Sequence, residues 1–357
     1  MGPVPEGGST GRGAWAEPGA QTVAPGVHRI PLPLPLDGLR AVNVYVLETD
    51  DGLVLVDGGW AIPESRQALV SGLRELGFAV RDIRRFLVTH MHRDHYTQAV
   101  ALGRELGAPI ALGAGERPTL QMMHSGALWD AGRTEPNVAR LRAAGAGHLA
   151  EQWLAAMPRR PEALEDYAEP DTWLERDTDV DLGARRLRAV ATPGHTQGHV
   201  VFADLDAGLL LAGDHVLSTI TPSIGFEPAW VRHPLRDYLS SLAKVRALPD
   251  LRLLPAHGPV TESSHTRIDE LVAHHAVRLG ASQDAVLAGA RTSWEVAGLL
   301  PWTRREHHRD ALGPFDAALA AFETLAHLEL LGLQGRLART HDDPSGPVRF
   351  APVVPRP

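Results

Sequence analysis

Residues 88–98 read VTHMHRDHYTQ, and they place three histidines and one aspartate within six positions, directly after an apolar run. His90 and His92 lie two positions apart, so on the extended end of a strand their side chains point the same way. Asp94 and His95 then fall on the turn into a following helix. Imidazole and carboxylate groups suit zinc and related divalent metals, so these two pairs of ligands predict two neighbouring metal ions.

A site for two metals needs further ligands, which we expect at the ends of later strands. His195 in TPGHTQGH, Asp214 in AGDH and His257 in PAHGP each have a glycine beside or near them, and glycine lets the backbone turn tightly. Loops at strand ends carry sites because a rigid scaffold positions them. The predicted metal ligands are therefore His90, His92, Asp94, His95, His195, Asp214 and His257.

Bulk composition bounds the class of protein. A single hydrophobic core rarely grows past about 250–300 residues, so 357 residues predict one large domain with a smaller appendix. The hydrophobic and charged fractions, 44% and 22%, are typical of a soluble globular protein. No apolar run approaches the roughly 18 residues of a membrane span, and no secretory signal is visible, so we expect a cytoplasmic protein without a membrane partner.

The absence of cysteine excludes thiolate metal sites and cysteine nucleophiles.

The charge balance disfavours nucleic acid as a partner, although charge can be local. The net charge is −8, whereas nucleic-acid binders usually carry a basic patch. Residues 282–341 hold six Arg against seven Asp and Glu, giving 6 − 7 = −1. For that segment we therefore expect a role in packing, or in forming a homodimer, rather than phosphate binding.

The chain divides by composition into three parts. Residues 1–24 are rich in Gly, Pro and Ala and predict a disordered tail. Residues 25–278 form the predicted catalytic domain, and residues 279–357 form a smaller C-terminal domain. Apolar periodicity and turn residues predict strands over 42–49, 53–57, 86–89, 109–112, 185–191, 199–212 and 251–254, and helices over 64–76 and 95–106.

Residues 115–176 interrupt this succession of strands and helices and are predicted to form a helical insertion. It contains the apolar side chains Met122, Met123, Trp129, Trp153 and Trp173. Such residues either line an adaptable substrate pocket or pack the insertion onto the body of the protein.

The C-terminal part predicts three helices followed by a hairpin. The helices are expected over 282–289, 293–299 and 315–331, before a Gly-rich segment. This order of elements fits a small winged-helix-like domain.

With these motifs the chain resembles the metallo-β-lactamase superfamily of hydrolases over roughly residues 26–275. The matching elements are 54–59 (VLVDGG), 89–95 (THMHRDH), 192–195 (TPGH), 212–214 (AGD) and 255–258 (PAHG). The beta-lactamase-like-2 branch is resembled by residues 217–227 (LSTITPSIGFE), the stretches PLRDYLSSLAKVRAL and LLPAHGPV, and the C-terminal helical domain. The resemblance implies an α/β (α+β) fold, an αββα sandwich with the site at one edge of its two sheets.

The resemblance also implies how the ligands divide. The residues that would bind the first metal are His90, His92 and His195, and those that would bind the second are Asp94, His95 and His257. The bridge between both metals would be Asp214. The residue that matches Asp57 supports the site by hydrogen bonding, and Gly58 stands where many relatives have Thr or Ser.

The expected chemistry is hydrolysis by a hydroxide that two divalent metal ions share. Zinc is the default, with iron or manganese as alternatives, and metal binding lowers the pKa of water from about 15.7 to about 7. Asp94 is the expected catalytic residue, because it binds metal and orients the nucleophile.

The substrate is open between two classes. A small acyl thioester, ester or lactone fits the negative charge and the apolar insertion, as in thioesterase relatives. An endoribonuclease acting on single-stranded RNA would need arginines near the metals, for which Arg232 and Arg236 are candidates. A non-hydrolytic binding protein is a third hypothesis, which the complete ligand set disfavours.

The other histidines are expected to play lesser roles. His199 and His215 are predicted to support the site or pack beneath it, and His124 in the insertion is a candidate for contacting substrate. Tyr96 is expected in the core. Those predicted to be surface, capping or solvated residues are His233, His265, His274, His275, His307 and His308.

Overall fold

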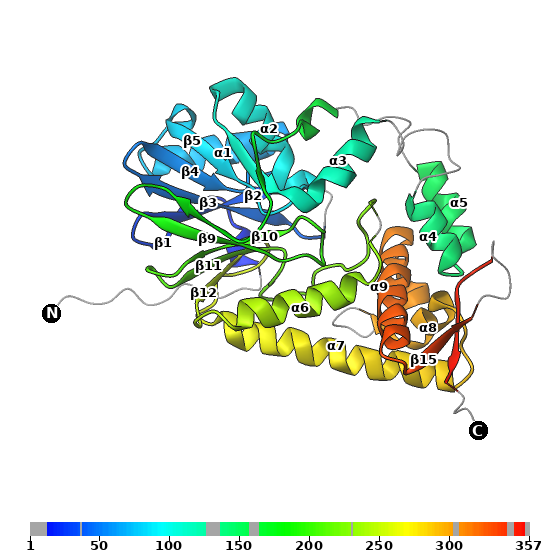
Figure 1. Cartoon of the computed structure of the whole chain (residues 1–357). Coiled ribbons are helices and arrows are strands. Elements are labelled where there is room, and N and C mark those ends of the chain that lie inside the picture. The colour runs from blue at the N-terminus through cyan, green and yellow to red at the C-terminus, as the bar shows by residue number, and fades with distance from the viewer. Residues whose placement is uncertain are drawn as a thin grey trace.

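A computed structural model describes the chain over residues 13–35, 38–125, 136–156, 164–229, 231–302, 307–340 and 346–353. In these residues two β-sheets stack face to face, with helices on both outer faces (Figure 1). The architecture is the expected αββα sandwich.

The first sheet orders its strands as they occur in the chain. It contains β1 (Gln21–Ala24), β2 (Val27–Pro33), β3 (Ala41–Thr49), β4 (Gly52–Val56), β5 (Ile83–Leu87), β6 (Ile110–Gly113) and β7 (Thr172–Leu174). Strands β1 to β4 pair antiparallel, and β4 to β7 pair parallel. The predicted hairpin around Gly52 is confirmed as β3 and β4.

The second sheet has the order β12-β11-β10-β9-β8. Its strands are β8 (Thr178–Asp181), β9 (Arg186–Ala191), β10 (Val200–Asp204), β11 (Leu209–Gly213) and β12 (Arg252–Pro255). Strands β11 and β12 pair parallel and the other neighbours pair antiparallel. The single strand expected over 199–212 is therefore wrong: it is two strands, because the chain reverses near Gly208, which has a φ of 68°.

Helices cover the two outer faces. Helices α1 (Pro63–Glu75) and α2 (Arg93–Leu106) lie on the first sheet, and α6 (Pro234–Arg246) and α7 (Ser264–Leu287) lie on the second (Figure 1). Helix α2 ends at Gly107, whose φ of 68° is the left-handed conformation that commonly terminates helices. The short 3-10 turns are η1 (Ala14–Ala16), η2 (Val80–Asp82), η3 (Ala114–Glu116), η4 (Leu164–Tyr167) and η5 (Arg309–Ala311).

Strand β3 shows how the layers are held together. Its side chains alternate between faces, so Tyr45 and Leu47 enter the core between the sheets, while Val44 and Val46 pack under the helices of the first sheet. Both faces of the strand are buried. Its backbone is therefore fixed from both sides, which makes the strand ends rigid supports for side chains.

The insertion packs against the C-terminal part of the chain. It contains α3 (Arg117–His124), α4 (Pro136–Ala143) and α5 (Gly147–Ala156). Val138 and Leu141 of α4 share a core with Ala318 and Phe322 of α9 (Pro314–Leu333). Of the two roles expected for the insertion, packing is confirmed for α4 and α5, whereas Leu120 and Met123 of α3 pack on the core of the first sheet. Trp129 lies outside the described residues.

The C-terminal elements follow the predicted order. They are the end of α7, α8 (Ser293–Leu299), the short pair β13 (Pro301–Trp302) and β14 (His307–His308), helix α9, and the hairpin of β15 (Leu337–Thr340) and β16 (Arg349–Pro352). Helix α7 runs unbroken across the boundary expected after residue 278, and the helix expected over 282–289 is its last part. The division into domains and the winged-helix assignment stay predictions.

The prediction of a disordered tail over residues 1–24 is wrong for its last part. Strand β1 pairs antiparallel with β2 across a turn at Gly26. Residues 1–12 lie outside the described part. Among the described helices, we find none with the length and apolarity that crossing a bilayer requires.

Candidate metal centre

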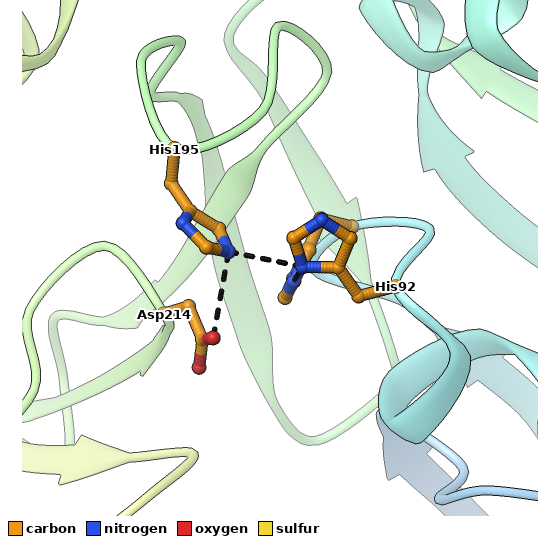
Figure 2. A group of neighbouring side chains, drawn as sticks. His92, His195 and Asp214 are labelled. Atoms are coloured by element: carbon orange, nitrogen blue, oxygen red, sulfur yellow. Dashed lines mark hydrogen bonds and ion pairs between the residues drawn. The ribbon is translucent and has the colours of Figure 1, made fainter. Parts of the chain in front are cut away.

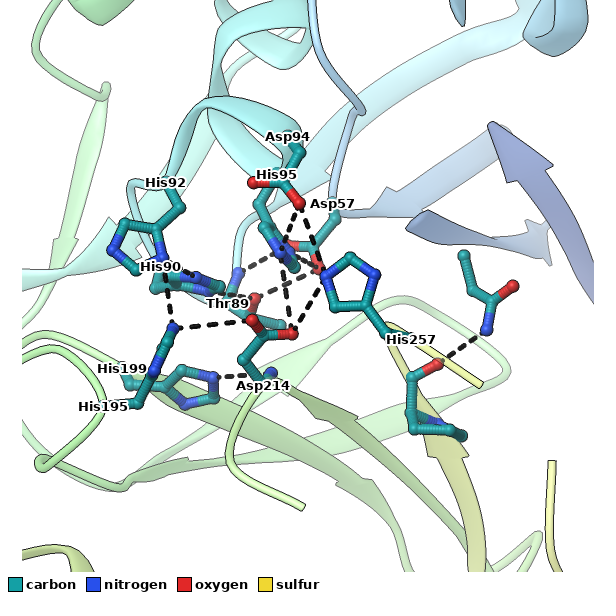
Figure 3. Close-up of polar contacts among 12 residues, drawn as sticks. Asp57, Thr89, His90, His92, Asp94, His95, His195, His199, Asp214 and His257 are labelled. Carbon is teal, nitrogen blue, oxygen red and sulfur yellow. Dashed lines mark hydrogen bonds and ion pairs between the residues drawn. The ribbon is translucent and has the colours of Figure 1, made fainter. Parts of the chain in front are cut away.

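The structure brings all seven predicted ligands together at one edge of the sandwich (Figure 3). Four of them follow β5, on the loop and first turn that lead into α2. The other three come from the second sheet: His195 lies between β9 and β10, Asp214 follows β11, and His257 follows β12. Each sheet thus supplies part of the cluster from the ends of its strands.

Two glycines allow these loops to approach closely. A Cβ atom at Gly213 would lie 2.7 Å from the Nε2 of His199 and 2.7 Å from the Cβ of Thr89. A Cβ atom at Gly194 would lie 2.5 Å from the Cα of Tyr238. Both glycines have positive φ, 51° and 144°, which glycine adopts without strain. The loops with Asp214 and His195 therefore need glycine at these positions.

The first group of ligands fits one metal ion (Figure 2). The Nδ1 of His92 lies 2.9 Å from the Nε2 of His90 and 3.1 Å from the Nε2 of His195. The Nε2 of His195 is 3.5 Å from the Oδ2 of Asp214. Zinc–nitrogen bonds of about 2.0–2.1 Å in a tetrahedron separate ligand atoms by about 3.3 Å. The observed spacing matches that value.

The second group surrounds a neighbouring point. The Nε2 of His257 lies 3.4 Å from the Oδ2 of Asp94 and 3.4 Å from the Oδ1 of Asp214. The Nε2 of His95 lies 3.6 Å and 3.7 Å from the same two oxygens. The Oδ2 of Asp214 thus lies near the first group, and its Oδ1 lies near the second.

Three buried atoms of the second group have no hydrogen-bond partner: the Nε2 atoms of His95 and His257, and the Oδ1 of Asp214. Buried polar atoms are almost always paired, so a convergent set without partners needs an explanation such as an ion. The nitrogen and oxygen donors present are those that divalent zinc, iron and manganese accept. The residues therefore fit a metal.

Hydrogen bonds on the far side of each ring hold the ligands in the right tautomer. The Nδ1 of His195 donates to the carbonyl of Ser223 at 2.8 Å, and the Nδ1 of His257 donates to the carbonyl of Ala41 at 2.7 Å. A carbonyl only accepts, so Nδ1 carries the proton and Nε2 keeps the lone pair for a metal. The Nδ1 of His95 lies 2.8 Å from the Oδ2 of Asp57, which likewise holds a proton on Nδ1 and turns Nε2 toward the metal group.

Asp57 organises the loop that precedes the ligands. Its Oδ1 accepts a hydrogen bond from the backbone N–H of Thr89 at 2.8 Å, and its Oδ2 accepts from the Thr89 hydroxyl at 3.1 Å. The same hydroxyl lies 3.0 Å from the Nδ1 of His90. Asp57 adopts a φ of 65° and is 2% exposed. The expected supporting role of Asp57 by hydrogen bonding is confirmed.

The electrostatics of the cluster favour a cation. Burial lowers the pKa of His92 to about 3, so its ring is neutral. Burial also acts to lower the pKa of His95, but the carboxylates of Asp94 and Asp57 outweigh it and raise that pKa to about 10. Without a metal, the ring therefore takes up a second proton on Nε2, which a bound metal would displace. Burial acts to raise the pKa of Asp214, yet His257 and His95 hold it below its ordinary value. The carboxylates are therefore ionised, and they need positive charge beside them.

The neighbouring histidines support the site as predicted. The Nε2 of His199 accepts from the backbone N–H of Asp214 at 3.1 Å, and its ring stacks on that of His90. His215 is buried beneath the site, where its carbonyl accepts from the Tyr238 hydroxyl at 3.0 Å.

The remaining predictions for single side chains have mixed outcomes. Tyr96 is buried as expected, and its hydroxyl donates to the carbonyl of Ala168. His124 donates to the carbonyl of Tyr167, so its predicted contact with substrate stays a prediction. The prediction that His275 is a surface or capping residue is wrong, because α9 packs over its side of α7 and leaves it fully buried.

The other five outlying histidines bear out their prediction where they are described. His233 precedes α6 as its N-cap, and His265 donates to the carbonyl of Leu248. His274 and His308 are exposed. The side chain of His307 lies outside the described residues.

Sequence reasoning missed two buried carboxyl groups that hold the loop after His195. Glu116 accepts from the hydroxyl of Thr196, and the Oε2 of Glu227 accepts from the backbone N–H of Gln197 at 2.9 Å. Burial raises the pKa of Glu116 to about 7 and that of Glu227 well above its ordinary value. Neither residue lies in a recognisable motif, so no signal in the sequence identified them.

Comparison with known proteins agrees with this geometry. Residues 37–257 match the family model described as the Metallo-beta-lactamase superfamily. A Beta-lactamase-like protein 2 homolog of Caenorhabditis elegans is 32% identical over 100 residues, which cover 28% of this chain and 31% of that protein. The match thus spans less than a third of that relative.

Two solved structures are similar over nearly the whole chain. A metallo-beta-lactamase family protein from Thermus thermophilus is 28% identical with a TM-score of 0.73, covering 93% of this chain and 100% of that one. A Beta-lactamase domain protein from Burkholderia ambifaria is 27% identical with a TM-score of 0.70, covering 93% and 94%. Together with the family match over more than half of its length, this shows that the chain belongs to the metallo-beta-lactamase superfamily and carries a His/Asp cluster suited to binding metal.

Proposed function

We propose that the protein is a dinuclear hydrolase of small acyl thioesters, esters or lactones. The observation that carries the dinuclear state is Asp214, whose Oδ2 faces His195 while its Oδ1 faces His257. One carboxylate directed at two separate ligand groups is best explained by two ions that share it. Zinc is the proposed metal, with iron or manganese as alternatives.

When bound, two divalent ions supply an activated water at neutral pH and polarise the carbonyl of the substrate. The chain's own part is to hold the reacting groups in place. Asp94 is the proposed catalytic residue: its side chain is 13% exposed, more than the 9% of Asp214. In the proposed role, the carboxylate of Asp94 would accept a hydrogen bond from the attacking water and orient it.

An aromatic wall, formed by Trp153, Phe226 and Phe315, supports an apolar substrate group. The ring of Phe226 lies 6.5 Å from that of His92. It meets Trp153 at 6.0 Å and Phe315 at 5.6 Å, and Trp153 stacks on Phe315 at 5.8 Å. The wall combines the insertion, the loop after β11 and helix α9. It places apolar surface directly beside a metal ligand, where the acyl group of a substrate would lie.

The alternative is cleavage of single-stranded RNA, because aromatic rings also stack on bases. That activity needs free positive charge for the phosphates. The guanidinium of Arg236 is paired with Asp237 at 2.7 Å. The buried guanidinium of Arg140 donates to the backbone carbonyl of Glu227 at 2.8 Å. The other candidate, Arg232, is exposed, so charge alone does not decide between the substrates, and the aromatic wall is what favours the acyl substrate.

A substrate panel on metal-reconstituted protein tests the proposal. Acyl thioesters of increasing chain length are compared with a fluorogenic single-stranded RNA. We expect thioester turnover, and in Phe226→Ala a KM raised about tenfold for long acyl chains but little for acetyl. Phe78→Ala, a half-buried phenylalanine of the first sheet's helical layer, is the matched control. Cleavage of RNA without thioester turnover would replace the proposal by its alternative.

A further inference from the structure

A second cluster of metal-type side chains lies where helices α7 and α9 cross, outside the centre described above. It consists of His274 and His275 on α7 and Glu323 on α9. One ligand atom from each residue lies within 4.8 Å of the others. Nothing in the hydrolytic chemistry uses these three side chains.

The hydrogen bonds around His275 settle which of its nitrogens is available. The Nδ1 of His327 lies 2.7 Å from the backbone carbonyl of Glu323, which only accepts, so this Nδ1 carries the proton. The Nε2 of a neutral His327 is therefore an acceptor. The Nδ1 of His275 lies 3.2 Å from it and must donate. The proton of His275 is then on Nδ1, and its Nε2 keeps a lone pair.

That Nε2 atom is buried and has no hydrogen-bond partner, in a residue that is 0% exposed. The catalytic ligands His195 and His257 are prepared in the same way, with Nδ1 donating inward and Nε2 left to bind. An outer hydrogen bond that fixes the tautomer is the usual support of a metal-binding histidine. His275 is thus oriented like a ligand by His327.

The hydrogen bonds described above leave both imidazoles neutral, each with its one proton on Nδ1. The cation near the cluster is Arg278, which interacts electrostatically with Glu323. The guanidinium of Arg278 donates to the carbonyl of Pro301 and lies over the ring of Trp302, so it is held by other partners. Neutral imidazoles are the form that binds metal.

We propose that His274, His275 and Glu323 form a third metal site, which binds Zn²⁺ or a similar divalent ion and ties α7 to α9. Two histidines and one carboxylate are a known zinc ligand set, with a fourth position left for water. The exposed His274 gives the ion a path from solvent, while His275 anchors it in the interior. The site joins the helical layer of the second sheet to the helix that also packs against the insertion.

Zinc binding to the full-length protein tests this site. Metal-free protein is titrated with Zn²⁺ by equilibrium dialysis, and bound metal is counted by mass spectrometry. We expect a third equivalent in the wild type. His274→Ala and Glu323→Gln should each weaken that third equivalent by more than about 100-fold, since loss of an outer partner alone costs about 10–100-fold. The first two equivalents should remain.

The matched control is Glu270→Gln, an exposed carboxyl on α7 that pairs with Arg267 and should keep all three equivalents. Circular dichroism confirms that each variant is folded. Zinc beyond two equivalents should also raise the unfolding midpoint of the wild type and of Glu270→Gln, but not that of His274→Ala. The proposal is overturned if the wild type takes up no third equivalent, or if both ligand variants retain it.

Discussion

Replacing Asp57 by asparagine should damage the second metal group selectively. The carboxylate accepts three hydrogen bonds, two from Thr89 and one from His95. Asparagine is nearly the same size and tolerates the left-handed backbone that Asp57 adopts. Its amide, however, has only one oxygen, so one N–H donor must face its NH₂ group.

The new amide can be oriented in two ways, and each orientation removes one of the hydrogen bonds that the carboxylate of Asp57 accepts. If the NH₂ group faces His95, the ring must move its proton to Nε2, which removes the lone pair directed at the metal. If it faces the backbone N–H of Thr89, a buried donor loses its acceptor at a cost of about 1–3 kcal/mol. Loss of an outer partner of a ligand weakens metal binding about 10–100-fold, or about 1.4–2.7 kcal/mol. We therefore expect the second group to bind metal about 10–100-fold more weakly.

The assay is a zinc titration against a competing chelator, with ring-nitrogen NMR signals to identify each group and the tautomer of His95. The His90 group should change less, because Asp57 reaches it only through the hydroxyl of Thr89. Asp51→Asn, at an exposed position nearby in the sequence, is the control. Unchanged affinity of the second group, or a larger loss at the His90 group than at His95, would refute this account of Asp57.

Three further predictions concern the site and its supports. His92→Ala and Asp214→Ala should abolish turnover while circular dichroism shows an intact fold; near-normal rates in both would show that the ligands are misassigned. Glu116 has its pKa raised from 4.5 to about 7 by burial, so its contribution to stability is complete below pH 4.5 and is lost as the pH rises through 7. Relative to Glu116→Gln, the wild type should lose roughly 3 kcal/mol of unfolding free energy between pH 4.5 and 8, and parallel pH profiles in denaturant titrations would contradict this. Gly113→Ala places a Cβ atom 1.9 Å from a backbone oxygen of the loop between β9 and β10 and should cost about 1–3 kcal/mol, whereas Gly147→Ala, with no atom within 4 Å, should be near neutral; equal unfolding midpoints would count against the clash.

The parts of the structure that the sequence predicted well depend on local pattern. The ligands are contiguous or follow apolar strands, so their motifs were visible before any contact was known. Strands such as β3 and β5 are buried on at least one face and are rich in apolar residues, so the layers of the sandwich followed. Asp57 was identified by the resemblance, and its hydrogen bonds to Thr89 and His95 agree with the role expected of it.

The parts that escaped prediction depend on partners far along the chain. His274 and His275 are neighbours with the same side chain, yet one is exposed and the other fully buried, because successive helical residues point about 100° apart and α9 covers only one side of α7. Glu116 is held by Thr196, 80 positions away. Strand β1 forms because its backbone pairs with that of β2. The Gly and Pro residues around it hide this strand in the sequence pattern.

The divided origin of the ligands has a consequence for how the protein assembles. Residues up to His95 belong to the first sheet, and those from His195 onward belong to the second. Neither half of the chain holds a complete coordination sphere, so tight metal capture must wait until the halves have docked. A metal bound there would link the two sheets. Because ligands that bind only the native state stabilise it by mass action, the free concentration of that metal would help to set the free energy of unfolding.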